Sequence, residues 1–405
     1  MTIPPPEPDL TPEKMLARAV AMRPMLRARQ ADCETAGRLS DDTNDAFVRA
    51  GFYRIVQPRR FGGYEFDVPT FFRVMMEVAR GCPESGWVLA LTAGHTHLFA
   101  TFAEAGQGEA YGITGEFRGP AAFNPPGTAI PVEGGFLIKG TWDYASGCDI
   151  ATHFFGLAII KDGGTAAPRG NITMLFDRDQ IRIVDNWRVM GMQGTGSRRV
   201  IVEETFVPAH RTMLLTTAQG EMVNDRPGRG VHPNPMYLGR TRPFLVGEAA
   251  AVAVGAARGA LDIYEDILRT KRTHFPPFEE RFKEREFQRH FGMASALVYA
   301  AEAALIGAGG EYMAYCDLEA GHDGGFDDAK EARITLIEQQ CVNMAWQAVE
   351  LMFRTGGTSA ANAGAPLGRY FRNLAVITTH LALQHEHSAT NAAQLHFGVP
   401  PLSRL

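Results

Sequence analysis

The sequence predicts an α+β protein built from three consecutive parts. These are a helical domain over residues 1–117, a central β-barrel over residues 118–215, and a linker with a four-helix bundle over residues 216–405. Helical periodicity predicts the two outer parts, and a middle zone rich in Gly, Pro and β-branched alternation predicts the barrel. The length agrees, because 405 residues exceed the roughly 250–300 at which a single core stops growing.

The first part carries the signals of a helix start. Thr11 is placed to cap a helix that has Pro12 at its first position. Apolar residues then recur every three or four positions, at Met15, Ala19, Met22 and Leu26. Two further helices are expected over residues 69–80 and 85–102, after a loop over residues 51–63.

The middle part has the pattern of strands joined by tight turns. Residues 128–132 and 136–140 flank the pair Gly134 and Gly135, which predicts a hairpin. Residues 154–160 and 172–176 are apolar enough for buried strands, and residues 199–206 alternate. A small barrel or sandwich follows from these strands.

The last part returns to long helical stretches after a connection rich in Gly, Pro and Arg over residues 216–242. The expected helices cover residues 246–270, 282–307, 327–354 and 375–394. Small residues on the first of them allow close helix approach, and four helices of this length form a bundle.

Composition excludes several classes of function. A formal net charge of −5 does not fit a nucleic-acid surface. The 5 cysteines are odd in number and none has metal-ligand spacing, so we expect free thiols and no metal. No secretory signal is visible, and the most apolar segment, residues 244–257, is short and contains Glu248. We expect a cytoplasmic protein with no membrane partner.

One motif is specific enough to indicate a family. Residues 192–200 read MQGTGSRRV, and the strand that follows closes with FVP at residues 206–208. The motif resembles the G-T-G-S turn of the acyl-CoA dehydrogenase superfamily. The chain from about residue 40 onward resembles more closely the flavin-dependent monooxygenases of that superfamily. The resemblance implies a helical domain, a barrel and a four-helix bundle.

The resemblance also implies cofactor contacts. The segment with Trp142 and Ser146 resembles the strand beside the isoalloxazine ring, where the hydroxyl at the position of Ser146 reaches flavin N5. Arg272 matches an arginine that contacts the cofactor phosphate. The remaining matched cofactor positions are Ala122, Phe123, Gly356, Gly357 and Arg369.

Two histidines and one missing carboxylate favour an oxygenase over a dehydrogenase. In many acyl-CoA dehydrogenases the catalytic glutamate lies at the position of Leu381, which cannot act as a base. His95 instead matches a histidine on the substrate side, and His380 matches one on the last bundle helix near flavin C4a. Glu248 remains a candidate base for the dehydrogenase alternative.

The resemblance therefore implies the oxygenase component of a two-component flavin-dependent monooxygenase. Reduced FMN or FAD and O2 would act through a C4a-hydroperoxyflavin, and the choice between FMN and FAD stays open. Because no Gly-x-Gly-x-x-Gly site for a nicotinamide follows a strand, a separate NAD(P)H:flavin reductase is expected. Family members are usually homotetramers.

The substrate is expected to be an aromatic or other apolar small molecule, with Phe123 and His95 beside it. Phenol-hydroxylating relatives carry a hydroxyl where this chain has Ala121 or Ala122, so phenols lose one polar contact. Two alternatives stay open: a flavin dehydrogenase acting on an acyl-CoA, and a non-catalytic helical oligomerisation protein.

Overall fold

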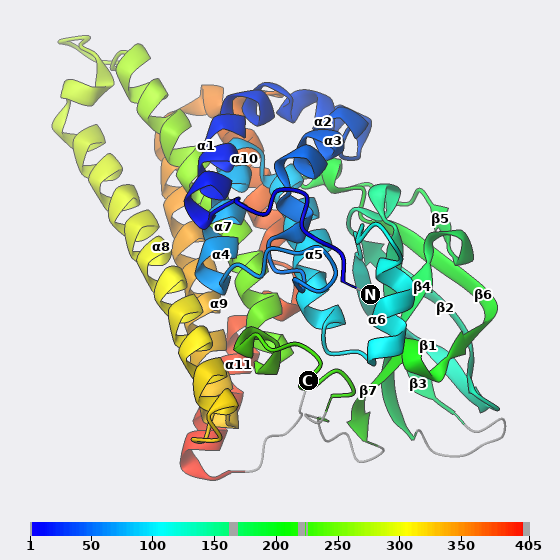
Figure 1. The fold of residues 1–405 in the computed structure, drawn as a ribbon. Helices are drawn as coiled ribbons and strands as arrows, with labels where there is room; N and C mark the ends of the chain where they lie inside the picture. The colour runs from blue at the N-terminus through cyan, green and yellow to red at the C-terminus, as the bar shows by residue number, and fades with distance from the viewer. Residues whose placement is uncertain (1, 162–168, 218–222, 224–225, 400–405) are drawn as a thin grey trace.

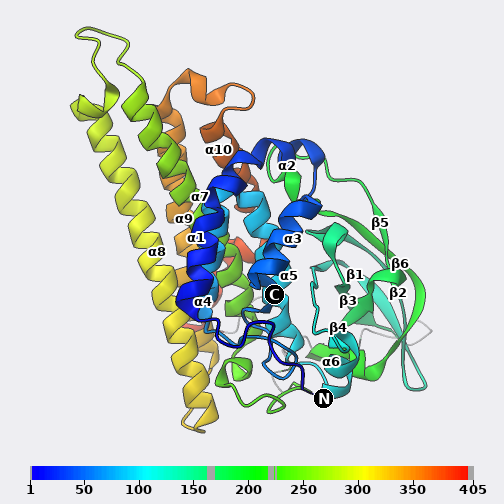
Figure 2. The same cartoon turned by 45° about the horizontal axis from the view of Figure 1, so that its top comes forward.

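The computed structural model describes residues 2–161, 169–217, 223 and 226–399. Within this part of the chain, the helices form one block and a single sheet lies beside it, with helix α5 between the two (Figure 1). Helix α8 runs along the outer edge of the block, far from the sheet in both views (Figure 2). The two halves of the fold therefore meet at α5.

The N-terminal part is helical, as predicted. Thr11 caps the first helix, since its side chain accepts a hydrogen bond from Lys14 N at 3.3 Å. Every residue of α5 except Leu91 is buried, which fits a helix packed on all sides. The helices are α1 (Pro12–Ala28), α2 (Gln30–Ala36), α3 (Asp41–Ala50), α4 (Val68–Gly81), α5 (Pro83–Phe99) and α6 (Glu104–Tyr111).

The middle part forms a seven-stranded sheet in the order β5-β6-β2-β1-β3-β4-β7. The predicted hairpin is confirmed, because Val132 pairs with Gly135 and Ala129 pairs with Ile138. In the described residues β5 and β7 are edge strands and the sheet does not close, so a barrel is not confirmed. The strands are β1 (Ala121–Val132), β2 (Gly135–Ala145), β3 (His153–Ile160), β4 (Gly170–Asp177), β5 (Arg182–Val184), β6 (Arg198–Pro208) and β7 (Thr212–Thr217).

The C-terminal part has three long helices and two short ones in the described residues. Helix α9 packs against both α7 and α8, and α10 packs against α7 and α9. The elements are α7 (Thr241–Thr270), α8 (Arg285–Ala320), α9 (Asp328–Gly356), α10 (Pro366–Ile377) and α11 (His385–Phe397), with the short 3₁₀ helix η9 (Leu381–Leu383) between the last two.

The prediction of one helix over residues 375–394 is wrong. Helix α10 ends at Ile377, and the chain turns before α11 starts at His385. Thr378 and Thr379 donate to the carbonyls of Ala375 and Val376 through their hydroxyls, which competes with continued helix bonding. His380 therefore lies in a connection and not on the last bundle helix.

Among the described residues, two helices are long and apolar enough to cross a membrane by length and composition alone, α7 and α8. The apolar window of α7 is 89% buried inside the fold, whereas that of α8 is 33% buried. The short segment singled out from the sequence belongs to a 30-residue helix, so its length was underestimated. Burial explains the apolar character of α7, and the absence of a membrane partner stays a prediction.

Candidate flavin site

The glycine turn over residues 192–197 is held by three helices. Asn373 Oδ1 of α10 accepts a hydrogen bond from Met192 N at 2.6 Å, and Glu84 Oε1 of α5 accepts one from Gly194 N at 2.8 Å. A Cβ atom on Gly194 would lie 2.4 Å from Cys33 Sγ of α2. The glycine at this position is therefore required by close packing as well as by the turn.

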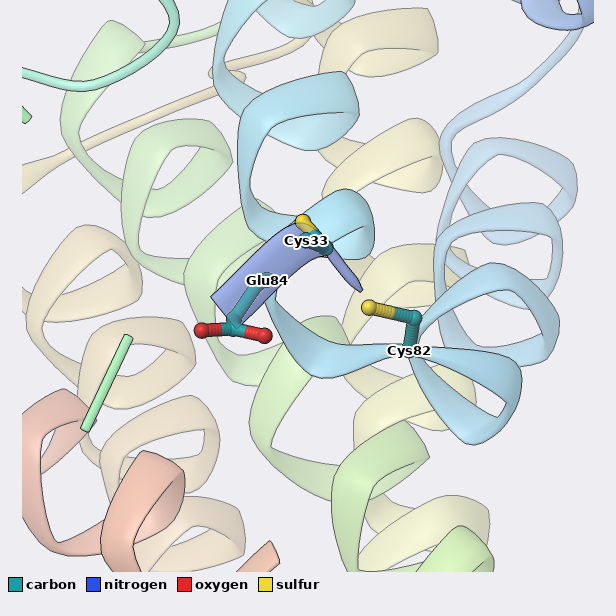
Figure 3. A group of neighbouring side chains, drawn as sticks. All are labelled: Cys33, Cys82 and Glu84. Atoms are coloured by element: carbon teal, nitrogen blue, oxygen red, sulfur yellow. The ribbon is translucent and has the colours of Figure 1, made fainter. Parts of the chain in front are cut away.

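Three buried side chains, which the sequence had not predicted to be neighbours, lie close to this turn. The side chains of Cys33, Cys82 and Glu84 are drawn in Figure 3, and their sulfur and carboxylate atoms lie within 4.8 Å of one another. Burial raises the pKa of Glu84 to about 8. Since Glu84 Oε1 already accepts from Gly194 N, the contact that the structure shows for this carboxyl supports the turn.

Ser146 stands at the end of a directed chain of hydroxyl groups. Thr195 Oγ1 donates to Met192 O at 2.8 Å, so Ser197 Oγ, 2.6 Å away, donates to Thr195. Ser146 Oγ lies 2.6 Å from Ser197 Oγ and must donate to it, because the Ser197 hydrogen is already used. The hydrogen of Ser146 is therefore committed.

The oxygen of Ser146 accepts one hydrogen bond in return. Trp87 Nε1 of α5 donates to it at 3.0 Å. A hydroxyl oxygen has two lone pairs, so Ser146 keeps one acceptor position free and no hydrogen to donate. This is the arrangement required to receive an N–H group such as flavin N5–H, and the residues present therefore fit a reduced flavin.

His380 lies beside the same tryptophan. Its ring meets the Trp87 ring edge-on, with centroids 5.4 Å apart. The Nδ1 atom accepts from Ala382 N at 3.3 Å, so the neutral ring carries its hydrogen on Nε2. His380 is exposed. The structure thus gathers Ser146, Trp87 and His380, although Trp87 had not been predicted.

His95 is buried in a different environment. Its Nδ1 lies 2.7 Å from Gly119 O, and its Nε2 lies 3.3 Å from Glu248 Oε1 of α7. Its ring faces Phe155 of β3 edge-on, with centroids 6.1 Å apart. The residue predicted for the substrate side and the candidate dehydrogenase base are therefore direct neighbours.

Arg272 and the glycines at the end of α9 come together through a second arginine. Arg281 donates to Gly356 O at 2.9 Å and to Arg272 O at 3.3 Å. Gly357 has φ +90°, a backbone conformation that favours glycine. Arg272 itself lies at the tip between α7 and α8, where Phe275 is 80% exposed. The cofactor role of this group stays a prediction.

Arg369 is committed within the chain. Its Nε donates to Glu34 Oε2 of α2 at 2.7 Å, and Arg372 pairs with the other oxygen of the same carboxylate. Only 7% of Arg369 is exposed. This geometry ties α10 to α2 and gives no support to a contact between Arg369 and the cofactor.

Three further predicted residues lie in or beside the sheet. Trp142 of β2 is fully buried and its Nε1 donates to Leu157 O at 2.9 Å, which makes it a core residue of the sheet. The structure thus gives no support to its predicted cofactor contact. Ala122 of β1 is also buried, and Phe123 is half-buried. A depression of about 590 Å³ near Arg60 and Glu104 contains none of the predicted residues.

Comparison with known proteins agrees with the motif. Residues 248–385 match the family described as acyl-CoA dehydrogenase, C-terminal domain. The flavin-dependent monooxygenase, oxygenase subunit HsaA, of Rhodococcus jostii is 30% identical over 390 residues, which cover 95% of this chain and 98% of that protein.

Two more similarities point the same way. The oxygenase component of an FADH2-dependent resorcinol hydroxylase from a Rhizobium species is 25% identical over 396 residues, which cover 96% of this chain and 95% of that one. The crystal structure of the HsaA monooxygenase from M. tuberculosis has a TM-score of 0.88 at 25% identity, over 98% of this chain and 100% of that one.

The fold and the relatives together define a flavoprotein of the acyl-CoA dehydrogenase type. The chain belongs to the flavin-dependent monooxygenases of this type, as an oxygenase component. The expectations of an enzyme, of reduced flavin and of O2 are thereby confirmed.

Proposed function

We propose that this chain oxygenates an aromatic or other apolar small molecule with reduced flavin supplied by a separate NAD(P)H:flavin reductase. The observation that carries the proposal is the donor–acceptor order at Ser146. Its hydrogen is committed to Ser197, and its oxygen has one free acceptor position beside the Trp87 donor. A group with an N–H, such as reduced flavin, is bound by such an oxygen.

The chain's own residues would hold the cofactor and position the substrate. Ser146 would accept the hydrogen of flavin N5, and His380, which lies beside Trp87, would offer its Nε2–H. When bound, the reduced flavin supplies the two electrons that activate O2. The buried indole of Trp87 helps to exclude water from this side of the site.

His95 and Phe123 are proposed on the substrate side. Relatives are named for aromatic substrates, resorcinol among them, which supports an aromatic substrate here. Because Ala121 or Ala122 stands where phenol hydroxylases carry a hydroxyl, the substrate has one polar anchor fewer on β1.

A homotetramer is also proposed. The outward face of α8 is lined by exposed apolar or small residues, and Met293 and Tyr299 there are 52% and 62% exposed. The tip with Arg272 and Phe275, beside Gly356 and Gly357, is the surface from which one copy would reach the cofactor of another. A cytoplasmic location and the choice between FMN and FAD stay predictions.

The oxygenase hypothesis is tested without a known substrate. Apo-protein with photoreduced flavin is mixed with oxygenated buffer, and absorbance is followed by stopped flow. We expect a species distinct from both reduced and oxidised flavin. In Ser146→Ala its lifetime falls roughly tenfold, since a lost hydrogen bond of about 1.4 kcal/mol corresponds to that factor.

Ser295→Ala is the matched control, because Ser295 is a buried serine of α8. It is expected to leave the lifetime unchanged. Direct return to oxidised flavin at the rate of buffer alone, or equal lifetimes in the two variants, would contradict the proposal.

A further inference from the structure

The contacts of His95 require a fixed number of protons. Gly119 O can only accept, so the Nδ1 atom 2.7 Å away carries a hydrogen and donates it. In a neutral ring the Nε2 atom is then an acceptor, and it faces Glu248 Oε1 at 3.3 Å. A bare carboxylate would repel that lone pair. Both contacts hold together only when Glu248 or Nε2 carries one additional proton.

Glu248 has no other hydrogen-bond partner among the described residues. Its side chain is 1% exposed, and neither carboxyl oxygen meets hydrogen-bond criteria with any group there, so the 3.3 Å approach of Oε1 to His95 Nε2 is an ion-pair contact. A Cβ atom on Gly94 would lie 1.9 Å from Glu248 Oε2. The glycine of α5 therefore leaves the space that this carboxyl occupies beside His95.

Such a pair is weak as a stabilising device. Burying two ionisable groups costs desolvation energy that their attraction barely offsets, and apolar residues of similar volume often do as well. Buried titratable pairs are more typical of sites that move or hold a proton. The position of His95 on the proposed substrate side agrees with such a role.

We propose that Glu248 is a positioning residue for His95, and that the two share a single proton whose loss frees one ring nitrogen of His95 to hydrogen-bond the substrate. The pair is neutral while it holds this proton. Loss of the proton breaks one of the two contacts of the ring, either at Gly119 O or at Glu248. The proposal rests on the proposed function, because His95 takes its meaning from the substrate side of the oxygenase site.

Few other titratable groups surround this part of α7 in the described residues. His97 of α5 stacks on Phe244, with centroids 4.1 Å apart. Glu338 of α9 lies against Gly247, where a Cβ atom would be 2.5 Å from its Oε1. Burial raises the pKa of Glu248 to about 7, against the opposing effect of His95. Its proton is therefore expected to leave near neutral pH.

The test is infrared difference spectroscopy of the full-length, flavin-free protein between about pH 5 and pH 9. The wild type is expected to show the C=O band of a protonated carboxyl that disappears near neutral pH. Glu248→Gln removes this band. His95→Gln keeps a carboxyl band but shifts both its frequency and its midpoint, because the shared proton loses its partner.

Glu338→Gln is the matched control, since Glu338 is equally buried and lies on α9 beside Gly247, with no hydrogen bond or ion pair to His95 in the described part of the chain. It should leave the Glu248 band and its midpoint in place. The proposal would be overturned if the wild-type spectrum contained no carboxyl band that Glu248→Gln removes. It would also be overturned if His95→Gln changed neither the frequency nor the midpoint of that band. Because the sample contains no flavin, neither result depends on the oxygenase test at Ser146.

Discussion

Replacing Glu248 by glutamine should change how the stability of the protein depends on pH. The ordinary pKa of a glutamate is 4.5, and burial raises that of Glu248 to about 7 in the folded protein. A carboxyl with a raised pKa contributes its stability fully below about pH 4.5. That contribution is lost as the pH rises through 7, because the folded state must then carry a buried charge.

The size of the effect follows from the two pKa values. One pKa unit corresponds to 1.36 kcal/mol, so the difference of about 2.5 units between the two pKa values sets an upper limit of about 3.4 kcal/mol on the stability that Glu248 loses between about pH 4.5 and pH 8. The glutamine side chain in Glu248→Gln has no proton to lose, and its amide can still donate to His95 Nε2. The free energy of unfolding of this variant relative to wild type should therefore rise with pH.

The assay is urea unfolding of both proteins at several pH values, at one protein concentration because the chain is proposed to assemble. Glu204→Gln on the exposed face of β6 is the control for the chemical change, with an expected difference that stays flat. A Glu248→Gln difference that is also constant within about 0.5 kcal/mol would refute the assignment of a buried, titrating carboxyl.

Three other substitutions test the surroundings of the site. Gly194→Ala places a methyl group 2.4 Å from Cys33 Sγ and should destabilise the protein by about 1–3 kcal/mol, measured by urea unfolding, with a weaker affinity for reduced flavin. Arg369→Met should cost about 1–3 kcal/mol, because one buried oxygen of Glu34 loses its donor while Arg372 stays paired with the other. The affinity for flavin in an equilibrium titration should stay unchanged, and a large loss of affinity would instead restore the predicted cofactor contact of Arg369. Arg272→Ala should leave stability within about 0.5 kcal/mol and weaken flavin binding; unchanged binding would remove Arg272 from the cofactor site.

The sequence was most informative where a regular period decides the structure. The helix after Thr11 and the hairpin around Gly134 followed from local rules and were confirmed. The last predicted helix failed at Thr378 and Thr379, because hydroxyl competition with backbone bonding is not visible in an apolar pattern. Whether the sheet closes into a barrel also could not be predicted from the sequence, because closure depends on pairing between distant strands.

For the site, the sequence found residues that a motif carries and missed those that only folding brings near. Ser146 and the 192–197 turn were identified from the motif. Trp87, which completes the acceptor geometry, lies 59 positions from Ser146 on another element. Glu248 was noted as an isolated carboxylate, and its pairing with His95 spans two helices of different domains. Periodicity predicts which face of a helix or strand a side chain occupies, but it does not predict which side chain of another element it contacts.

The hydroxyl chain at Ser146 and the pair of His95 and Glu248 respond to pH in different ways. The direction of the chain from Ser146 to Met192 O is set by hydroxyl groups and an indole, which keep their hydrogens throughout the neutral range. The acceptor position for the flavin is therefore the same at about pH 6 and about pH 8, as far as Ser146 decides it. Burial raises the pKa of Glu248 to about 7, so the proton that we propose it shares with His95 should leave within that range. Glu248→Gln should therefore abolish a transition near neutral pH only in steps that involve the substrate. The lifetime of the oxygenated flavin species, measured without substrate, should depend on pH in this variant as it does in the wild type.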